Sequence, residues 1–222
     1  METEPIQTWP GYREIPARLN ITREVLDKQL ESGLGDRTAF VFAGGSISYA
    51  ELYARVNGLA RGLSGLGIVK GARIMIRLPN CLEFAVSFLA LLKIGAVPVL
   101  QNSLLGPGEV AYVREHSEAT AAITLDSVAG PLRALIGDLP RGLIVARGAG
   151  VAGHSFERLI EENSGEPLDC ADTDANEAAF FVYTSGTTGR PKGIVHAHRW
   201  VIALGDTNKL RLPPHDGDVA MA

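Results

Sequence analysis

Residues 178–193 read AAFFVYTSGTTGRPKG, an apolar run followed by a loop rich in hydroxyl groups and glycine. The apolar run predicts a buried strand. In the loop, glycine lets backbone N–H groups approach an anion closely, and Ser and Thr hydroxyls add neutral donors. Arg190 and Lys192 supply positive charge. The stretch therefore predicts a phosphate-binding loop at the end of a strand, and polyphosphate chemistry is the first hypothesis.

Two common phosphate loops do not match this stretch. The P-loop of nucleotide hydrolases ends in Gly-Lys-Ser/Thr after four intervening residues, but Pro191 stands where the second glycine should follow Gly186. The dinucleotide fingerprint opens a helix, whereas Pro191 disfavours helical angles at Arg190 and predicts an extended continuation. Both alternatives are excluded on these grounds.

Taken whole, Tyr183–Gly193 resembles the phosphate-loop signature of the adenylate-forming superfamily. That superfamily includes acyl-CoA synthetases, adenylation domains of peptide synthetases and firefly-type luciferases. Further segments are similar to the amino-terminal half of the same family, so the resemblance covers nearly the whole chain: Asp36–Phe40, Ile47–Leu52, Gly67–Ile74 and Leu89–Val99. Because many of the matched positions are structural, they support the fold more than they identify a substrate.

The resemblance implies ATP, Mg²⁺ and coenzyme A as cofactors and a small carboxylic acid as substrate. The acid would be activated as an acyl-adenylate with release of pyrophosphate, and a thiol would then take the acyl group. Lys192 is the candidate catalytic residue, a mobile counter-charge for the phosphates, and no metal ligand is assigned. The β- and γ-phosphates would be bound by the hydroxyls of Thr184, Ser185, Thr187 and Thr188 and the amides of Gly186 and Gly189.

The same resemblance sets an expectation for the domain organisation. Family members run to roughly 500 residues or more, beyond the usual size of one domain. Residues 1–222 are therefore expected to form the amino-terminal part of the large AMP-binding domain, with the rest of it and the carboxy-terminal domain absent. Most of the acyl pocket, the adenine contacts, the acidic Mg²⁺ residue and the adenylation lysine follow this region in the family, so this chain alone is expected to be inactive.

Three functional hypotheses remain open. The first is the amino-terminal part of an acid:CoA ligase, and Pro16–Ile21 and His196–Arg199 look most like the benzoate, aminobenzoate and medium-chain acid ligases. The second is a peptide-synthetase adenylation domain, which would load a carrier protein. The third is a shortened, non-catalytic nucleotide-binding or interaction module, favoured by the absence of the later motifs.

Composition narrows the class of protein. The chain has 222 residues, 46% of them hydrophobic, and a net charge of −4, which gives no reason to expect nucleic-acid or membrane attraction. Its longest apolar run, Phe84–Leu92, has nine residues, against roughly 20 for a membrane-spanning helix. The acidic start Met1–Pro5 is unlike a secretory signal, and Cys81 and Cys170 lie far apart. These features predict a cytoplasmic protein without a membrane span.

Hydrophobic periodicity predicts alternating strands and helices, hence an α/β fold with mainly parallel, layered sheets and flanking helices. Predicted caps are Asn20, Ser48 with Glu51, Asn80 with Glu83, and Asp126. The predicted strands are 39–42, 46–48, 72–78, 97–100, 120–125, 143–146, 178–182 and 194–196. The predicted helices are 21–30, 48–66, 80–94, 107–117, 128–136, 155–162 and 198–208.

A few residues call for a structural rather than a chemical interpretation. His196 and His198 have no third ligand nearby and are interpreted as one outward and one inward histidine. Phe180 and Trp200 are expected in the core or its wall. Strands that later segments would cover are expected to expose apolar edges, which favours association into homo-oligomers.

Overall fold

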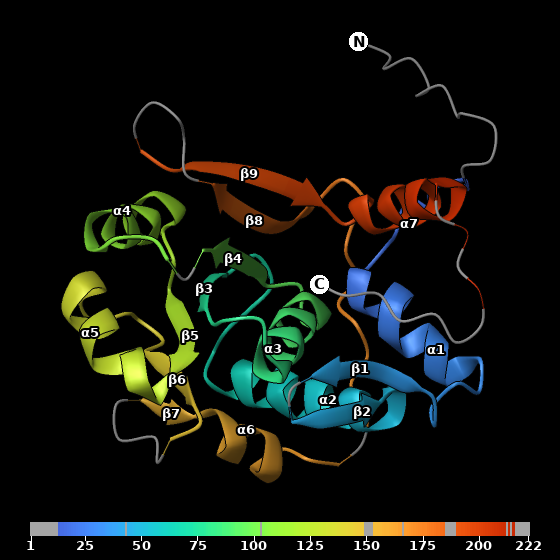
Figure 1. The fold of residues 1–222 in the computed structure, drawn as a ribbon, viewed down its shortest axis with the longest axis horizontal. Helices are drawn as coiled ribbons and strands as arrows, with labels where there is room; N and C mark the ends of the chain where they lie inside the picture. The colour runs from blue at the N-terminus through green and yellow to red at the C-terminus, as the bar shows by residue number, and fades with distance from the viewer. Residues whose placement is uncertain are drawn as a thin grey trace.

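The computed structural model describes most of the chain around one large sheet (Figure 1). The described residues are 13–42, 44–102, 104–148, 153–165, 167–184, 190–211, 213 and 215. The sheet's strands are β3 (Arg73–Arg77), β4 (Val97–Gln101), β5 (Ala121–Leu125), β6 (Leu143–Ala146), β7 (His154–Ser155), β8 (Ala178–Thr184) and β9 (Lys192–Ala197). Their spatial order is β7-β6-β5-β3-β4-β8-β9, and every neighbouring pair is parallel except β8–β9.

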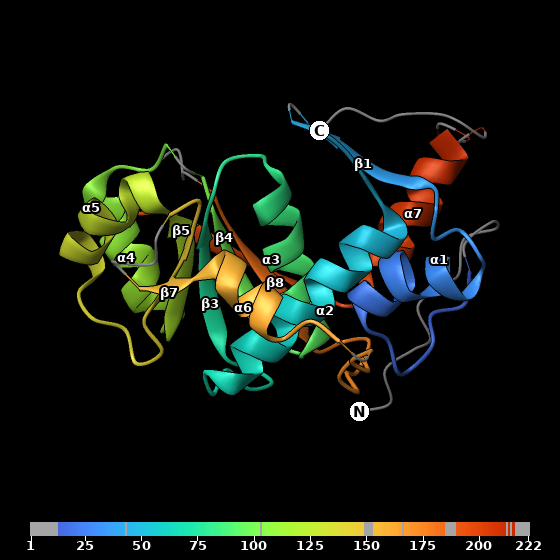
Figure 2. The same cartoon turned by 90° about the horizontal axis from the view of Figure 1, so that it is seen from below.

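Helices cover both faces of this sheet (Figure 2). They are α2 (Tyr49–Gly65), α3 (Leu82–Lys93), α4 (Pro107–Ser117), α5 (Asp126–Ile136) and α6 (Phe156–Glu162), and α7 (Trp200–Arg211) follows β9. Helices α2, α3 and α6 lie on one face and α4 and α5 on the other. Parallel strands need such crossover helices, and both faces are consequently buried. The predicted α/β fold with a mainly parallel sheet is confirmed.

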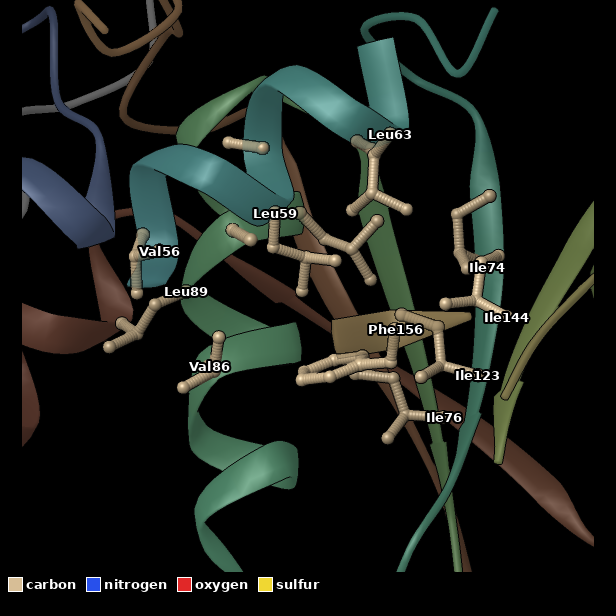
Figure 3. Close-up of a cluster of buried hydrophobic side chains, with 14 of the residues drawn as sticks. Val56, Leu59, Leu63, Ile74, Ile76, Val86, Leu89, Ile123, Ile144 and Phe156 are labelled. Atoms are coloured by element: carbon tan, nitrogen blue, oxygen red, sulfur yellow. The ribbon is translucent and has the colours of Figure 1, made fainter. Parts of the chain in front are cut away.

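Alternate strand residues supply the two cores. Ile74, Ile76 and Ile123 face α2 and α3, where they pack with Leu59, Leu63, Val86 and Phe156 (Figure 3). Met75 and Ala122 point the other way, into a second cluster beneath α4 and α5. This alternation is the two-residue period of a strand, and burial on both sides explains why these strands read as continuous apolar runs.

The predicted helix caps were only partly correct. Ser48 and Glu51 form the predicted capping box at the start of α2, and the Asn20 Oδ1 accepts the backbone N–H of Thr22 at 3.0 Å. The other two predicted caps are wrong: α3 begins after Cys81 rather than Asn80, and α5 begins at Asp126 itself. The two carboxylate oxygens of Glu83 bind the Arg147 guanidinium instead, each at 2.8 Å.

The amino-terminal part packs beside α2 and α3. The predicted hairpin is confirmed as β1 (Thr38–Phe42) and β2 (Gly45–Ser48), which pair antiparallel. The predicted helix 21–30 is observed at residues 21–31, with a π-helical segment η1 (Arg23–Asp27) preceding α1 (Lys28–Glu31). Ile21 and Leu26 on this helix are buried, as is Thr22, whose Oγ1 donates to the carbonyl of Leu89 at 2.7 Å.

A buried ion pair that the sequence did not reveal joins this helix to α3. The Lys93 ammonium is fully buried and lies 2.9 and 2.8 Å from the two carboxylate oxygens of Asp27. The Cys170 thiol donates to the same carboxylate at 3.2 Å, and the Tyr53 ring lies 4.9 Å below the ammonium. Burial raises the pKa of the Cys170 thiol to about 12, so this thiol stays protonated.

β9 forms one edge of the sheet and is longer than the predicted extended segment 194–196. It reaches Lys192 because pairing with β8 continues to the end of both strands. Ile194 and Val195 are about half exposed on it, as the expectation of exposed apolar edges requires, while the homo-oligomer remains a prediction. Among the described helices none combines the length and apolar character needed to cross a membrane.

Candidate functional site

The candidate site is the end of the β8–β9 hairpin. Thr184, the last residue of β8, is the register partner of Lys192, the first of β9, and both are exposed. The pairing therefore brings a hydroxyl-bearing residue and an ammonium-bearing residue to the same end of the hairpin. The remaining predicted phosphate-binding residues lie outside the described residues: Ser185, Gly186, Thr187, Thr188 and Gly189.

Gly193 has a steric role in this hairpin. It is the register partner of Tyr183, and a Cβ placed on it would lie 2.9 Å from Cζ of the Tyr183 ring. That separation is shorter than van der Waals contact allows. Only glycine therefore lets the Tyr183 ring pack across the β9 backbone at this point.

Helix α4 contacts the residues on either side of the loop, a feature that the sequence did not reveal. The Nδ1 of His116 and the Oη of Tyr183 form a hydrogen bond of 2.7 Å. One turn earlier on the same helix, the Tyr112 ring lies 5.2 Å from the guanidinium carbon of Arg190. The i, i+4 spacing of Tyr112 and His116 in a predicted helix was an available signal, but the identity of their partners was not.

A cavity of about 520 Å³ lies beside the hairpin. It is lined by Phe84 of α3 and by residues at or just after the carboxyl ends of β3, β4 and β8: Leu78, Pro79, Asn80, Leu100, Gln101, Asn102, Val182 and Tyr183. Ligands of open α/β sheets bind outside the carboxyl ends of the strands. The loop therefore begins at the edge of the sheet where this fold class places its ligands.

The two histidines after β8 have structural positions. The His198 side chain is buried, and its Nδ1 accepts the backbone N–H of Ile21 at 3.3 Å. His196 stacks on Phe180 with ring centroids 4.6 Å apart, and Trp200 contacts both rings. The described part of the chain holds no cluster of three or more potential metal ligands. His198 therefore points inward and Phe180 and Trp200 lie in the core or its wall, as predicted, whereas His196 is half-buried against two aromatic rings rather than facing outward.

His198 should make stability depend on pH. Burial lowers the pKa of His198 to about 4, against the opposing effect of the Glu177 carboxylate and with a smaller contribution from Lys70, whereas an unfolded histidine titrates at about 6.5. Between these values the unfolded state binds more protons, so stability is complete above pH 6.5 and is lost as the pH falls toward 4. We expect urea unfolding to show that the wild type loses about 2–3 kcal/mol more than His198→Asn between pH 7.5 and 4.5.

The substitution His198→Asn keeps an acceptor for the Ile21 N–H but removes the titrating group. Carboxylates titrate in both proteins, so the difference between them isolates the histidine. Equal losses of stability in the two proteins would contradict the assignment.

The comparisons agree on one family. The model of the family described as AMP-binding enzyme matches residues 26–222. The benzoate–CoA ligase of Thauera aromatica is 32% identical over 192 residues, which cover 85% of this chain and 36% of that ligase. The chain thus spans little more than a third of the length of this curated relative.

Solved structures give the same result. The anthranilate CoA ligase AuaEII in complex with anthranoyl-AMP superposes with a TM-score of 0.77 at 26% identity, over 83% of this chain and 36% of that one. ATP-bound MatB from Rhodopseudomonas palustris gives 0.74 at 26% identity, over 86% and 37%. Since the family match spans most of the chain and the fold agrees, this chain belongs to the AMP-binding family of adenylate-forming enzymes.

Proposed function

We propose that residues 1–222 are part of the large AMP-binding domain of an AMP-forming acid:CoA ligase. The observation that carries the proposal is the family match across residues 26–222, which includes the hairpin where Thr184 and Lys192 pair. The names of the relatives support the reaction class, because they include a benzoate–CoA ligase and an anthranilate CoA ligase. An aromatic carboxylic acid is accordingly the proposed substrate class.

The proposed reaction has two steps. A carboxylate oxygen attacks the α-phosphorus of ATP, which gives an acyl-adenylate and pyrophosphate, and the thiol of coenzyme A then displaces AMP. The first step needs donors already placed around the charge that develops on the departing pyrophosphate. We assign the Lys192 ammonium and the Thr184 hydroxyl to that task, together with the hydroxyls of Ser185, Thr187 and Thr188 and the amides of Gly186 and Gly189.

The described donors suit a polyphosphate. Ammonium and hydroxyl groups are donors that phosphate oxygens accept, and Lys192 and Thr184 are both exposed at one end of the hairpin. For Mg²⁺, no cluster of three or more potential ligands occurs among the residues that the structure describes. We therefore assign no residue of this chain to the metal, and none to coenzyme A.

The test is pyrophosphate exchange by the natural polypeptide that contains this chain, screened against carboxylic acids. We expect exchange that depends on an added acid, with benzoate, 2-aminobenzoate and medium-chain acids as the first set. If amino acids were the only acids that supported exchange, the peptide-synthetase alternative would be favoured. Binding of ATP without exchange for any acid would favour the non-catalytic module, and a reaction without added acid is the control.

The isolated 222-residue chain provides a second comparison. Because it spans only about a third of the length of its relatives, we expect it to give no acid-dependent exchange under the same conditions. Measurable exchange by the purified chain would contradict this expectation.

A further inference from the structure

We propose that helix α4 positions both stems of the phosphate loop, through His116 on the β8 side and Tyr112 on the β9 side. The stems are defined here as Tyr183–Thr184 and Arg190–Gly193. The proposal rests on the proposed function for its claim that the loop binds ATP, but the contacts themselves do not depend on it. Tyr112 and His116 would be positioning residues, since neither is assigned a contact with substrate.

The contact on the β8 side is a hydrogen bond to a buried phenol. The Oη of Tyr183 lies 2.7 Å from Nδ1 of His116, and the two rings meet edge to face with centroids 5.9 Å apart. Burial raises the pKa of Tyr183, so the phenol stays protonated at neutral pH and can donate to the imidazole. Because Tyr183 directly precedes Thr184, this bond holds the backbone from which the loop departs.

The contact on the β9 side is a cation over an aromatic ring. The Arg190 guanidinium carbon lies 5.2 Å from the centroid of the Tyr112 ring, within the range of a cation–π interaction. Arg190 comes two residues before Lys192, the proposed counter-charge. Tyr112 in turn contacts His116, with ring centroids 5.2 Å apart. One face of one helix therefore contacts the chain both before and after the loop.

Helix α4 is itself held firmly against the sheet. Its Val110 and Val113 are fully buried, and the Arg73 side chain of β3 donates to the carbonyl of Ser117 at its last turn. The hairpin is less well supported, because β9 is an edge strand whose Ile194 and Val195 are exposed. Figure 1 shows α4 next to the end of the hairpin at which β8 ends and β9 begins. The packed helix can therefore hold the end of the hairpin in place, which the edge strand alone cannot do.

The first experiment tests the contacts without nucleotide, by amide hydrogen exchange in the stems. We expect His116→Ala, Tyr183→Phe and Tyr112→Leu to speed exchange at Thr184 and Lys192 by about threefold to tenfold, the loss of one hydrogen bond or ring contact. Glu115→Ala, an exposed neighbour on the same helix, is the matched control and should change nothing. Unchanged stem exchange in all three variants would overturn the proposal.

The second experiment asks whether the stems matter for ATP. In the natural polypeptide, His116→Ala and Tyr183→Phe should each raise the KM for ATP by about threefold to tenfold and leave the KM for the acid within about twofold. The double variant should lose no more than either single one, because both remove the same bond. His116→Asn, which retains an acceptor near the Nδ1 position, should restore most of the affinity.

The outcomes separate this proposal from the proposed function. A selective rise in the KM for ATP together with faster stem exchange supports both the role of α4 and the proposed function. An equal loss for ATP and acid accompanied by a lower Tm, or faster stem exchange with an unchanged KM for ATP, would show that the contacts with α4 only stabilise the fold and would overturn the claim that they position the loop for ATP. If the wild type neither binds ATP nor exchanges pyrophosphate, the proposed function fails and the claim about ATP fails with it, whereas faster stem exchange would still support the contacts with α4.

Discussion

Lys93→Met is expected to lower the free energy of unfolding by about 3–5 kcal/mol, the usual cost of removing one partner of a buried ion pair. The Lys93 ammonium is fully buried and lies within 2.9 Å of both oxygens of Asp27. Without it, the Asp27 carboxylate would remain nearly buried with only the Cys170 thiol as a described side-chain donor. Urea unfolding at neutral pH would measure the loss.

Two further variants make this prediction specific. Lys28→Met removes the exposed cation of an i, i+4 pair with the partly buried Glu24 and should cost less than about 1 kcal/mol. Lys93→Met combined with Asp27→Leu should recover much of the stability lost in Lys93→Met, because it leaves no unpaired charge in the core. If Lys93→Met lost no more than Lys28→Met, the buried pair would not contribute as described.

Lys192→Ala should slow acid-dependent pyrophosphate exchange by about 100-fold in the natural polypeptide, the scale at which removal of one preorganised charge-stabilising group acts. Its side chain is exposed at the end of the hairpin opposite Thr184, so its loss should not alter folding. The expected signature is a lower kcat/KM for ATP with an unchanged Tm. The reason is that Lys192 would neutralise charge that accumulates on the departing pyrophosphate.

Lys209→Ala is the matched control for this variant, because it removes another lysine that is exposed but lies on α7, away from the hairpin end. Its exchange rate should equal that of the wild type. Lys192→Arg should recover only part of the rate, since a planar guanidinium does not replace a compact, mobile ammonium. An unchanged exchange rate in Lys192→Ala would remove Lys192 from the proposed mechanism.

Local patterns predicted most of the elements because their determinants lie within a few residues. The helix Pro107–Ser117 was predicted with its observed bounds, and the Ser48–Glu51 capping box formed as its sequence indicated. Prediction failed where a residue far away in the sequence binds a side chain that the local pattern assigned to a helix cap. Glu83 could have capped a helix from Asn80, but Arg147, which is 64 residues away, binds its carboxylate instead.

The sequence predicts a chemistry for the candidate site, but it did not indicate which residues pack around the site. The residue types of Tyr183–Gly193 indicate phosphate binding, and Pro191 excludes a helix after the loop, as the β9 strand confirms. Nothing near Tyr183 in the sequence indicates that its hydroxyl binds His116, 67 residues earlier. Such a partner depends on how α4 packs on the sheet.

By itself the sequence determined the class of fold and the family, and it predicted phosphate binding for the loop, because each inference depends on short-range spacing of apolar, glycine and hydroxyl-bearing residues. Only the tertiary structure decided that Lys93 is neutralised by Asp27, that His198 is buried against Ile21, and that α4 contacts both ends of the loop. These contacts join residues far apart in the chain. Burial and electrostatic pairing depend on distances in space, which local sequence patterns do not specify.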